Sequence, residues 1–309
     1  MSNAIKKGRY TAAEVLFFIT WTLYSASYFI LGSELSAACD VDTLKNAISY
    51  VSLLLLLISL LLVDRYTKTE IIKYLVFLAV IFLVEITITE RALLIYVFFM
   101  ILAQHIDVEK LLRYDIKLKV CMLIVIVGMC AVGITDNYTA VINGNYKEAW
   151  GFSHPNTFTC YVLTILVEWL CVRYGKMKWY EWLLVIGCAL AVEHIGGGRS
   201  SVYTFAVIFL LFVLAAVVPK LFYTKLVKLA FAVVTPLMAA LSFLAVWLYD
   251  QGNAFAIKLN SILTTRISLA SRFLNTYDLK LFGQEIEYIG TRQAQIDGVS
   301  SNILDNAYI

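Results

Sequence analysis

The stretch LAFAVVTPLMAALSFLAVWLY, at residues 229–249, runs for 21 residues without a charged side chain. A helix rises about 1.5 Å per residue and the apolar core of a bilayer is about 30 Å thick, so a run of this length can span a membrane. Apolar runs of similar character lie at 12–32, 44–63, 70–88, 120–135, 156–172, 179–196 and 200–218, with a shorter one at 92–104. The sequence therefore predicts an all-α polytopic membrane protein with about nine transmembrane helices.

The composition excludes a water-soluble fold. The 309 residues are 61% hydrophobic and 15% charged, against about 25% charged in an ordinary soluble domain. The net charge of +3 is too small to indicate a nucleic-acid partner. No Cys or His spacing suits a metal, so we expect neither a metal nor another cofactor. The apolar run after Arg9 is too long for a cleavable signal peptide and is expected to be the first span.

The basic residues of the predicted loops set the orientation of the chain. Loops placed on one side carry 16 Lys and Arg residues, whereas the short loops on the other side carry 4. The four are Lys45, Arg91, Lys147 and Arg199. Because basic loops stay inside, the N-terminus is predicted to be cytoplasmic. Residues 1–249 then form a transmembrane domain with an outer loop at 136–155, and residues 250–309 form an extracellular segment.

Two amphipathic helices are predicted at the membrane surfaces. In the last segment, apolar residues recur at helical spacing, which indicates one helix with Arg266 and Arg272 on its polar side. These apolar residues are Leu259, Leu263, Ile267, Ala270 and Leu274. On the inner side, a basic-flanked helix is expected to anchor the protein to anionic lipid. Its apolar residues are Val108, Leu111, Leu112 and Ile116.

The sequence GFSHPN, at residues 151–156, opens a span on the outer side. Pro155 suits the first helical position, with His154 or Ser153 as the cap. The outward helix N-terminus favours an anion and disfavours a charged imidazole, so His154 should stay neutral and serve as a base or hydrogen-bond partner. A capping loop with an incidental histidine is the equally weighted alternative.

The sequence EHIGGGRSS, at residues 193–201, connects two spans on the same outer side. Its glycines suit a helix C-cap, and Ser200 or Ser201 is expected to cap the next helix. Arg199 beside that helix start suits a phosphate or diphosphate. The alternative is a tight turn whose arginine reaches the lipid headgroups. We expect Arg199, Lys147, Arg266 and His154 to form one cationic outer site.

Glu85 and Glu168 lie inside predicted spans, where an ionisable residue is a functional candidate by default. Each also has a basic residue near it in sequence. We therefore expect structural pairing or snorkelling, of Glu168 with Arg173 and of Glu85 with Arg91.

At these motifs the chain resembles the bacterial Wzy-like polysaccharide polymerases, relatives of the O-antigen ligases. The resemblance covers about residue 147 to the end, whereas the first 120 residues agree only in hydropathy. Five motifs carry it, in the family's order: GFxHPN at 151–156, Gly-Arg-Ser at 198–200, LNxxLxxR at 259–266, LFGQ at 281–284 and DNxY at 305–308.

The resemblance implies a GT-C-like membrane glycosyltransferase that lengthens a polysaccharide outside the bacterial cytoplasmic membrane. Its donor is expected to be a glycan on undecaprenyl diphosphate, and its acceptor a second lipid-linked unit. A flippase and a chain-length regulator are expected partners besides membrane lipid. The chemistry requires no metal, because cations hold the diphosphate and a side chain takes the proton.

The resemblance also assigns roles to residues. Arg199, Lys147 and Arg266 are expected to bind the diphosphate, and Asn156, Ser200 and Asn306 to support the site. Asp305 is the favoured base because the related ligases place their acid–base residue there, and His154 is the other candidate.

Two features depart from the family pattern. Position 147 is Lys where relatives often have Arg, and relatives place two or more helices after the DNxY motif, so we expect the chain to lack the enzyme's last spans. Three other functions compete. They are a ligase that uses another acceptor, a transporter or flippase, and a non-catalytic partner of a capsule assembly complex.

Overall fold

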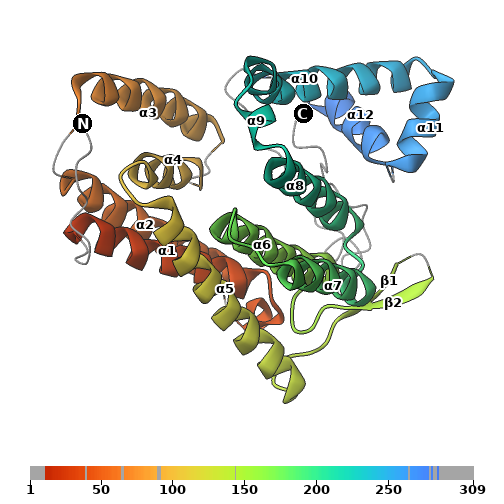
Figure 1. The fold of residues 1–309 in the computed structure, drawn as a ribbon, viewed down its shortest axis with the longest axis horizontal. Coiled ribbons are helices and arrows are strands. Elements are labelled where there is room, and N and C mark those ends of the chain that lie inside the picture. The colour runs from red at the N-terminus through yellow and green to blue at the C-terminus, as the bar shows by residue number, and fades with distance from the viewer. Residues whose placement is uncertain are drawn as a thin grey trace. The chain divides into compact units, whose positions relative to one another are not determined.

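The computed structural model describes residues 11–38, 40–63, 66–88, 92–142, 144–263 and 265–277, together with Lys280 and Gln284. Within these ranges, nine helices overlap the nine predicted spans. They are α1 (Ala12–Leu31), α2 (Val41–Leu61), α3 (Lys68–Ile88), α4 (Ala92–Ala103), α5 (Val108–Ala131), α6 (Pro155–Arg173), α7 (Trp179–Gly196), α8 (Arg199–Val217) and α10 (Lys225–Asp250) (Figure 1). Shorter helices are η1 (Glu34–Ala38), α9 (Pro219–Phe222), α11 (Ala254–Ile262) and α12 (Arg266–Thr276).

The fold is that of an all-α protein with membrane-spanning helices. Among the described residues, four helices are long and apolar enough to cross a bilayer, and two shorter apolar stretches accompany them. The four are Ala12–Leu31, Thr43–Leu61, Pro155–Arg173 and Lys225–Asp250, and the shorter two are Ala92–Ala103 and Ser201–Val217. The number of crossings, nine, stays a prediction.

Capping side chains set several of the helix starts. Thr11 and Glu14 form a reciprocal capping box at α1, with N···O distances of 3.2 and 2.9 Å. Asp40, Asp107 and Thr224 accept backbone N–H groups at the starts of α2, α5 and α10. These polar residues satisfy N–H groups that the first turn of a helix leaves without an internal partner.

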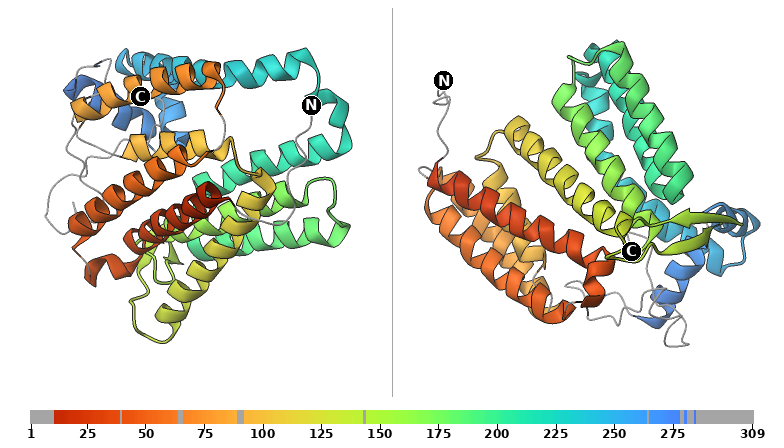
Figure 2. Two further views of the ribbon diagram at one scale, coloured as in Figure 1. Left: turned by 90° about the vertical axis from the view of Figure 1, so that its left-hand side faces the viewer. Right: turned by 90° about the horizontal axis from the view of Figure 1, so that it is seen from below.

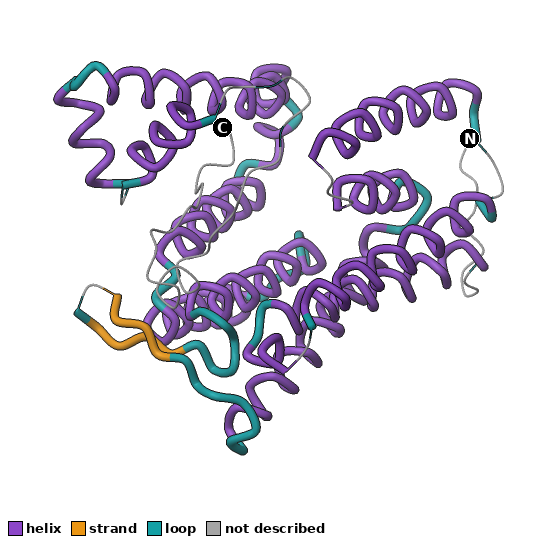
Figure 3. Tube along the Cα trace, turned by 180° about the vertical axis from the view of Figure 1, so that it is seen from behind, coloured by secondary structure: helices purple, strands orange, loops and turns teal. Residues whose placement is uncertain are grey.

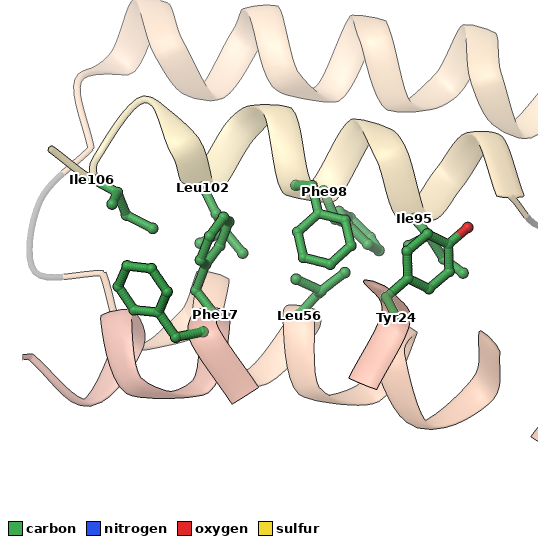
Figure 4. Packing of buried hydrophobic residues seen from close by; sticks show 9 residues of the cluster. Phe17, Tyr24, Leu56, Ile95, Phe98, Leu102 and Ile106 are labelled. Atoms are coloured by element: carbon green, nitrogen blue, oxygen red, sulfur yellow. The ribbon is translucent and has the colours of Figure 1, made fainter. Parts of the chain in front are cut away.

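The chain packs as two units, residues 1–81 with 91–217 and residues 82–90 with 218–309. In the first unit, α1 and α2 run side by side (Figure 2), and α4 lies against them. Figure 4 shows α4 directing Ile95 and Leu102 toward Phe17 and Leu56, and these four side chains are at most 2% exposed. Phe17 also meets Phe99 edge-to-face with centroids 5.5 Å apart, a favoured aromatic geometry.

The same unit contains a second group of helices, in which α6 packs against α5, α7 and α8. Leu163 and Leu170 of α6 meet Val185 and Phe205 of its neighbours in a buried cluster. Between α5 and α6 the chain forms an antiparallel hairpin, β1 (Thr139–Ile142) with β2 (Asn145–Glu148), drawn in orange in Figure 3. This hairpin was not among the sequence predictions.

Both predicted surface helices differ from expectation. The inner-face helix is not separate, because residues 108–131 form the single helix α5. The predicted amphipathic helix of the last segment is two helices, α11 and α12, and the chain turns between them at Thr265, whose φ is +67°. In this second unit, Ile267 and Ala270 still pack on Val246 of α10.

Candidate functional site

The His-Pro pair starts α6 as the sequence predicts. His154 is the N-cap residue, in extended conformation, and Pro155 takes the first helical position. The backbone N–H of Asn156 donates to His154 Nδ1 at 3.1 Å. Burial lowers the pKa of His154, so the imidazole is neutral at neutral pH. Because Nδ1 accepts this hydrogen bond, the single proton of the neutral ring lies on Nε2.

The loop that precedes His154 is attached to the end of α1. The backbone N–H and the hydroxyl of Ser153 both donate to the Gly32 carbonyl, at 3.0 and 3.1 Å. The N–H of Glu34 donates to the carbonyl of Gly151 at 2.9 Å. Phe152 is fully buried, with its ring near those of Phe29 and Tyr161. These contacts hold the position and direction of the His154 backbone.

The glycine turn between α7 and α8 lies directly on α6. Gly197 is the left-handed C-cap of α7, with φ +64°, and its N–H donates to the carbonyl of Glu193 at 2.8 Å. A Cβ atom at Gly196 would lie 2.2 Å from Thr159 Oγ1, and one at Gly198 would lie 2.8 Å from Thr159 Cβ. Only glycine allows this approach, which brings the N-termini of α6 and α8 close together.

The predicted serine cap of α8 is wrong. The helix begins at Arg199, and the N–H of Val202 donates to the carbonyl of Gly198 at 3.0 Å. Ser200 and Ser201 therefore lie within the first turn. The side chains of Arg199 and Ser200 lie outside the described part of the structure, whereas their backbone places them at the helix start.

Lys147, on β2, reaches the same turn. Its Nζ donates to the carbonyls of Glu193 and His194, at 3.1 and 2.6 Å. Its aliphatic stem covers Gly197, where a Cβ atom would lie 2.9 Å from Lys147 Cγ. The C-terminal carbonyls of a helix favour a cation, so Lys147 stabilises the end of α7 and fixes the turn.

The structure brings His154, Lys147 and the glycine turn together. Asn156 is exposed in the first turn of α6. Arg266 is the first residue of α12 in the second unit. Asp305 and Asn306 lie outside the described residues. The residues that the structure brings into contact, His154, Lys147 and the glycine turn, all belong to the first unit.

Asn260 holds the turn that leads to Arg266. Its carbonyl accepts from the N–H of Thr265 at 2.9 Å, and its Oδ1 accepts from the N–H of Ser268 at 3.0 Å. Asn260 is 9% exposed. Left-handed backbone at a β-branched residue such as Thr265 is strained, and the two Asn260 contacts hold it there.

Sequence reasoning missed the residues that assemble this site, Thr159 and the hairpin that carries Lys147. A signal for the hairpin was present, because the dipeptide Asn143–Gly144 favours a two-residue β-turn. Thr159 gave no signal, because residue spacing along the chain does not predict which residue of another helix packs on a glycine run.

The expected pairing of Glu168 with Arg173 is wrong. Arg173 donates from Nε and Nη2 to the two carboxylate oxygens of Glu181, at 2.9 and 3.0 Å. Glu168 instead pairs with Lys119 of α5. The expected partner of Glu85, Arg91, lies outside the described residues.

The close contact of the glycine turn leads to a stability prediction. Gly196→Ala places a methyl group against Thr159 and should lower the unfolding free energy by about 1–3 kcal/mol through overpacking. Gly187→Ala, in the middle of the same helix, meets no atom within 4 Å and should leave stability unchanged or slightly higher. Thermal unfolding in detergent measures both, and equal midpoints for the two variants would contradict the proposed contact.

No protein-family model matches the chain, and no curated protein or solved structure matches it either. In the part of the chain that the structure describes, no group of three or more His, Cys, Asp or Glu side chains is arranged to hold a metal.

Proposed function

We propose that the chain is a Wzy-like membrane polysaccharide polymerase, which joins oligosaccharide repeat units carried on undecaprenyl diphosphate at the outer face of the bacterial cytoplasmic membrane. The observation that supports this most is the packing of the glycine turn on Thr159, because it gathers GFSHPN and Gly-Arg-Ser at adjacent helix starts. Two helix N-termini in contact concentrate N–H groups and positive dipole ends, which favour a diphosphate.

The first unit supplies five residues for the donor. Arg199 starts α8 and offers a forked guanidinium to the diphosphate. Lys147 has three N–H groups, two of which donate to α7 carbonyls, and the third is available for a phosphate oxygen. His154 offers its Nε2–H, while Asn156 and Ser200 add polar groups in the first turns of their helices.

The resemblance assigns the remaining roles. Arg266 is proposed as a further cation for the diphosphate, and Asp305 with Asn306 as the groups that bind the acceptor hydroxyl. The hydroxyl oxygen attacks C1 of the donor sugar as the bond from C1 to the diphosphate oxygen breaks. The hydroxyl proton passes to Asp305, and the diphosphate leaves with the bonding electron pair, stabilised by the cations.

Reconstitution of the full-length protein in lipid vesicles with lipid-linked repeat units tests the activity. A polymerase converts these units alone into a ladder of longer chains and releases undecaprenyl diphosphate. A ligase, which uses the same donor chemistry, forms product only when a different acceptor is added. Transport of intact lipid-linked units without new glycosidic bonds would instead support the transporter alternative.

The proposal also requires a particular topology, with nine crossings, an inside N-terminus and both motif loops outside. The basis is the excess of basic residues in loops on one side, 16 against 4. Reporter fusions after Gly144 and Gly252 should report an external location, and fusions after Lys176 a cytoplasmic one. A cytoplasmic location for either of the first two would remove the proposed outer site.

A further inference from the structure

A buried ionic cluster joins three helices of the first unit. Lys119 Nζ lies 2.7 Å from Asp115 Oδ2 and also pairs with Glu168 Oε1. The second oxygen of Asp115 accepts from Trp21 Nε1 at 2.8 Å. Asp115 is 4% exposed and Glu168 is 8% exposed. The cluster therefore links α1, α5 and α6 within a predicted membrane domain.

The charges in this cluster do not balance. Two carboxylates face one ammonium group, which leaves one negative charge in excess if both acids are ionised. Glu168 Oε2 is buried and has no hydrogen-bond partner among the described residues. An unpaired buried charge costs several kcal/mol, and more inside a membrane. Some additional positive charge must therefore accompany the folded cluster.

Among the described residues, Lys119 is the one cation that pairs with Glu168. The charged groups that act on Glu168 are Lys119 and Asp115, both from α5, and the thiol of Cys171 lies close by on α6. On its other sides α6 packs against α7 and α8 through an apolar cluster, and Arg173 of α6 already pairs with Glu181 of α7. A metal ion would require several oxygen ligands, and the described residues contain no such group. A proton needs only one oxygen.

We propose that Glu168 Oε2 is a proton-binding site, so that the folded cluster contains one protonated acid and is neutral. The protonated carboxyl keeps Oε1 as an acceptor for Lys119 and leaves Asp115 as the ionised partner. This assignment leaves no buried charge uncompensated. Asp115 is the less suitable site for the proton, because both of its oxygens already have partners. One accepts a hydrogen bond from Trp21, and the other pairs with Lys119.

A cavity gives this proton a way to exchange. A space of about 670 Å³ has Trp21 and Lys119 on its wall, the two side chains that contact Asp115. Tyr24, Tyr28 and Tyr96 also line it, and the hydroxyls of Tyr28 and Tyr96 are 2.6 Å apart. Hydroxyls both donate and accept, so water and tyrosines in the cavity can carry a proton toward the cluster.

Infrared spectroscopy of the full-length protein in lipid nanodiscs tests the site. At neutral pH the wild type should show the carbonyl band of a protonated carboxylic acid, and Glu168→Gln should lose it. Glu181→Gln is the matched control, because Glu181 is also 8% exposed but has both oxygens bonded to Arg173. The band should be unchanged in that variant.

Thermal unfolding gives an independent measurement. The folded protein holds a proton that the unfolded chain has lost at neutral pH, so the wild-type midpoint should fall as pH rises. Glu168→Gln should lack this part of the pH dependence, whereas Glu181→Gln should keep the wild-type slope. The proposal would be overturned if the wild type lacked the carbonyl band of a protonated acid at neutral pH. It would also be overturned if Asp115→Asn lost this band while Glu168→Gln kept it.

Discussion

Arg199→Ala in the full-length protein is expected to abolish polymer formation while leaving the amount of folded protein unchanged. The backbone of Arg199 begins α8 beside the glycine turn, and Gly198 packs on Thr159 of α6. A guanidinium there adds charge and two parallel N–H donors to the helix start that we propose binds the diphosphate. Loss of such a donor typically costs on the order of a hundredfold or more in rate.

The measurement is polymer formed per unit of protein in vesicles supplied with lipid-linked repeat units. Arg199→Lys should keep part of the activity, since the charge remains and the forked contact is lost. Lys258→Ala is the matched control, because it removes one exposed cation from the predicted outer segment without touching a motif residue that we assign to the site. Wild-type polymer levels from Arg199→Ala would show that Arg199 has no role in donor binding and that the Gly-Arg-Ser turn only connects two helices.

Local features of this fold were predictable because they depend on neighbouring residues. Pro155 suits the first position of a helix, so the start of α6 follows from the sequence, which left His154 and Ser153 as alternative caps, and the structure has His154. The glycine run at 196–198 likewise predicts the end of α7, because left-handed backbone at a C-cap favours glycine, and the cap is Gly197. Both predictions are confirmed.

Contacts between distant segments were not predictable in the same way. Glu168 has Arg173 five positions away, yet it pairs with Lys119 on another helix, and Arg173 pairs with Glu181. Sequence spacing gives the distance along one helix and says nothing of which helices face each other. The partners of Lys147 and the packing of Gly198 on Thr159 belong to the same class.

Periodicity also failed to show where a helix breaks. Residues 259–274 have apolar residues at helical spacing, and most of them do pack on α10. The chain nevertheless turns at Thr265, because the buried Asn260 satisfies the N–H groups of Thr265 and Ser268 that a continuous helix would bond elsewhere. A hydrophobic pattern records which side of a segment is buried and is compatible with two helices that share that side.

The geometry around His154 bears on whether His154 or Asp305 is the base in the proposed reaction. His154 Nδ1 accepts from the backbone of Asn156, and burial lowers the pKa of His154 so that the ring stays neutral. The ring proton is then on Nε2, which makes His154 a hydrogen-bond donor toward the site. A ring nitrogen that already carries a proton cannot take the acceptor proton, so we propose Asp305 rather than His154 as the base of the proposed reaction.

Asp305→Asn should therefore lower turnover by roughly a hundredfold or more while donor binding persists, because the amide keeps the size of the side chain and removes its basicity. His154→Asn is the matched variant, since asparagine is a good N-cap and preserves the start of α6 but removes the Nε2–H. It should weaken donor binding and cost less turnover than Asp305→Asn.

The pH dependence of the wild-type rate separates the two candidates independently. If His154 were the base, the rate would fall at acid pH as its imidazole protonates. Burial lowers the pKa of His154 from its usual value near 6.5, so the decline would lie below that pH. Near-normal turnover in Asp305→Asn, together with that acid decline in the wild type, would transfer the role of base to His154 and require the Asn156 contact to open during the reaction.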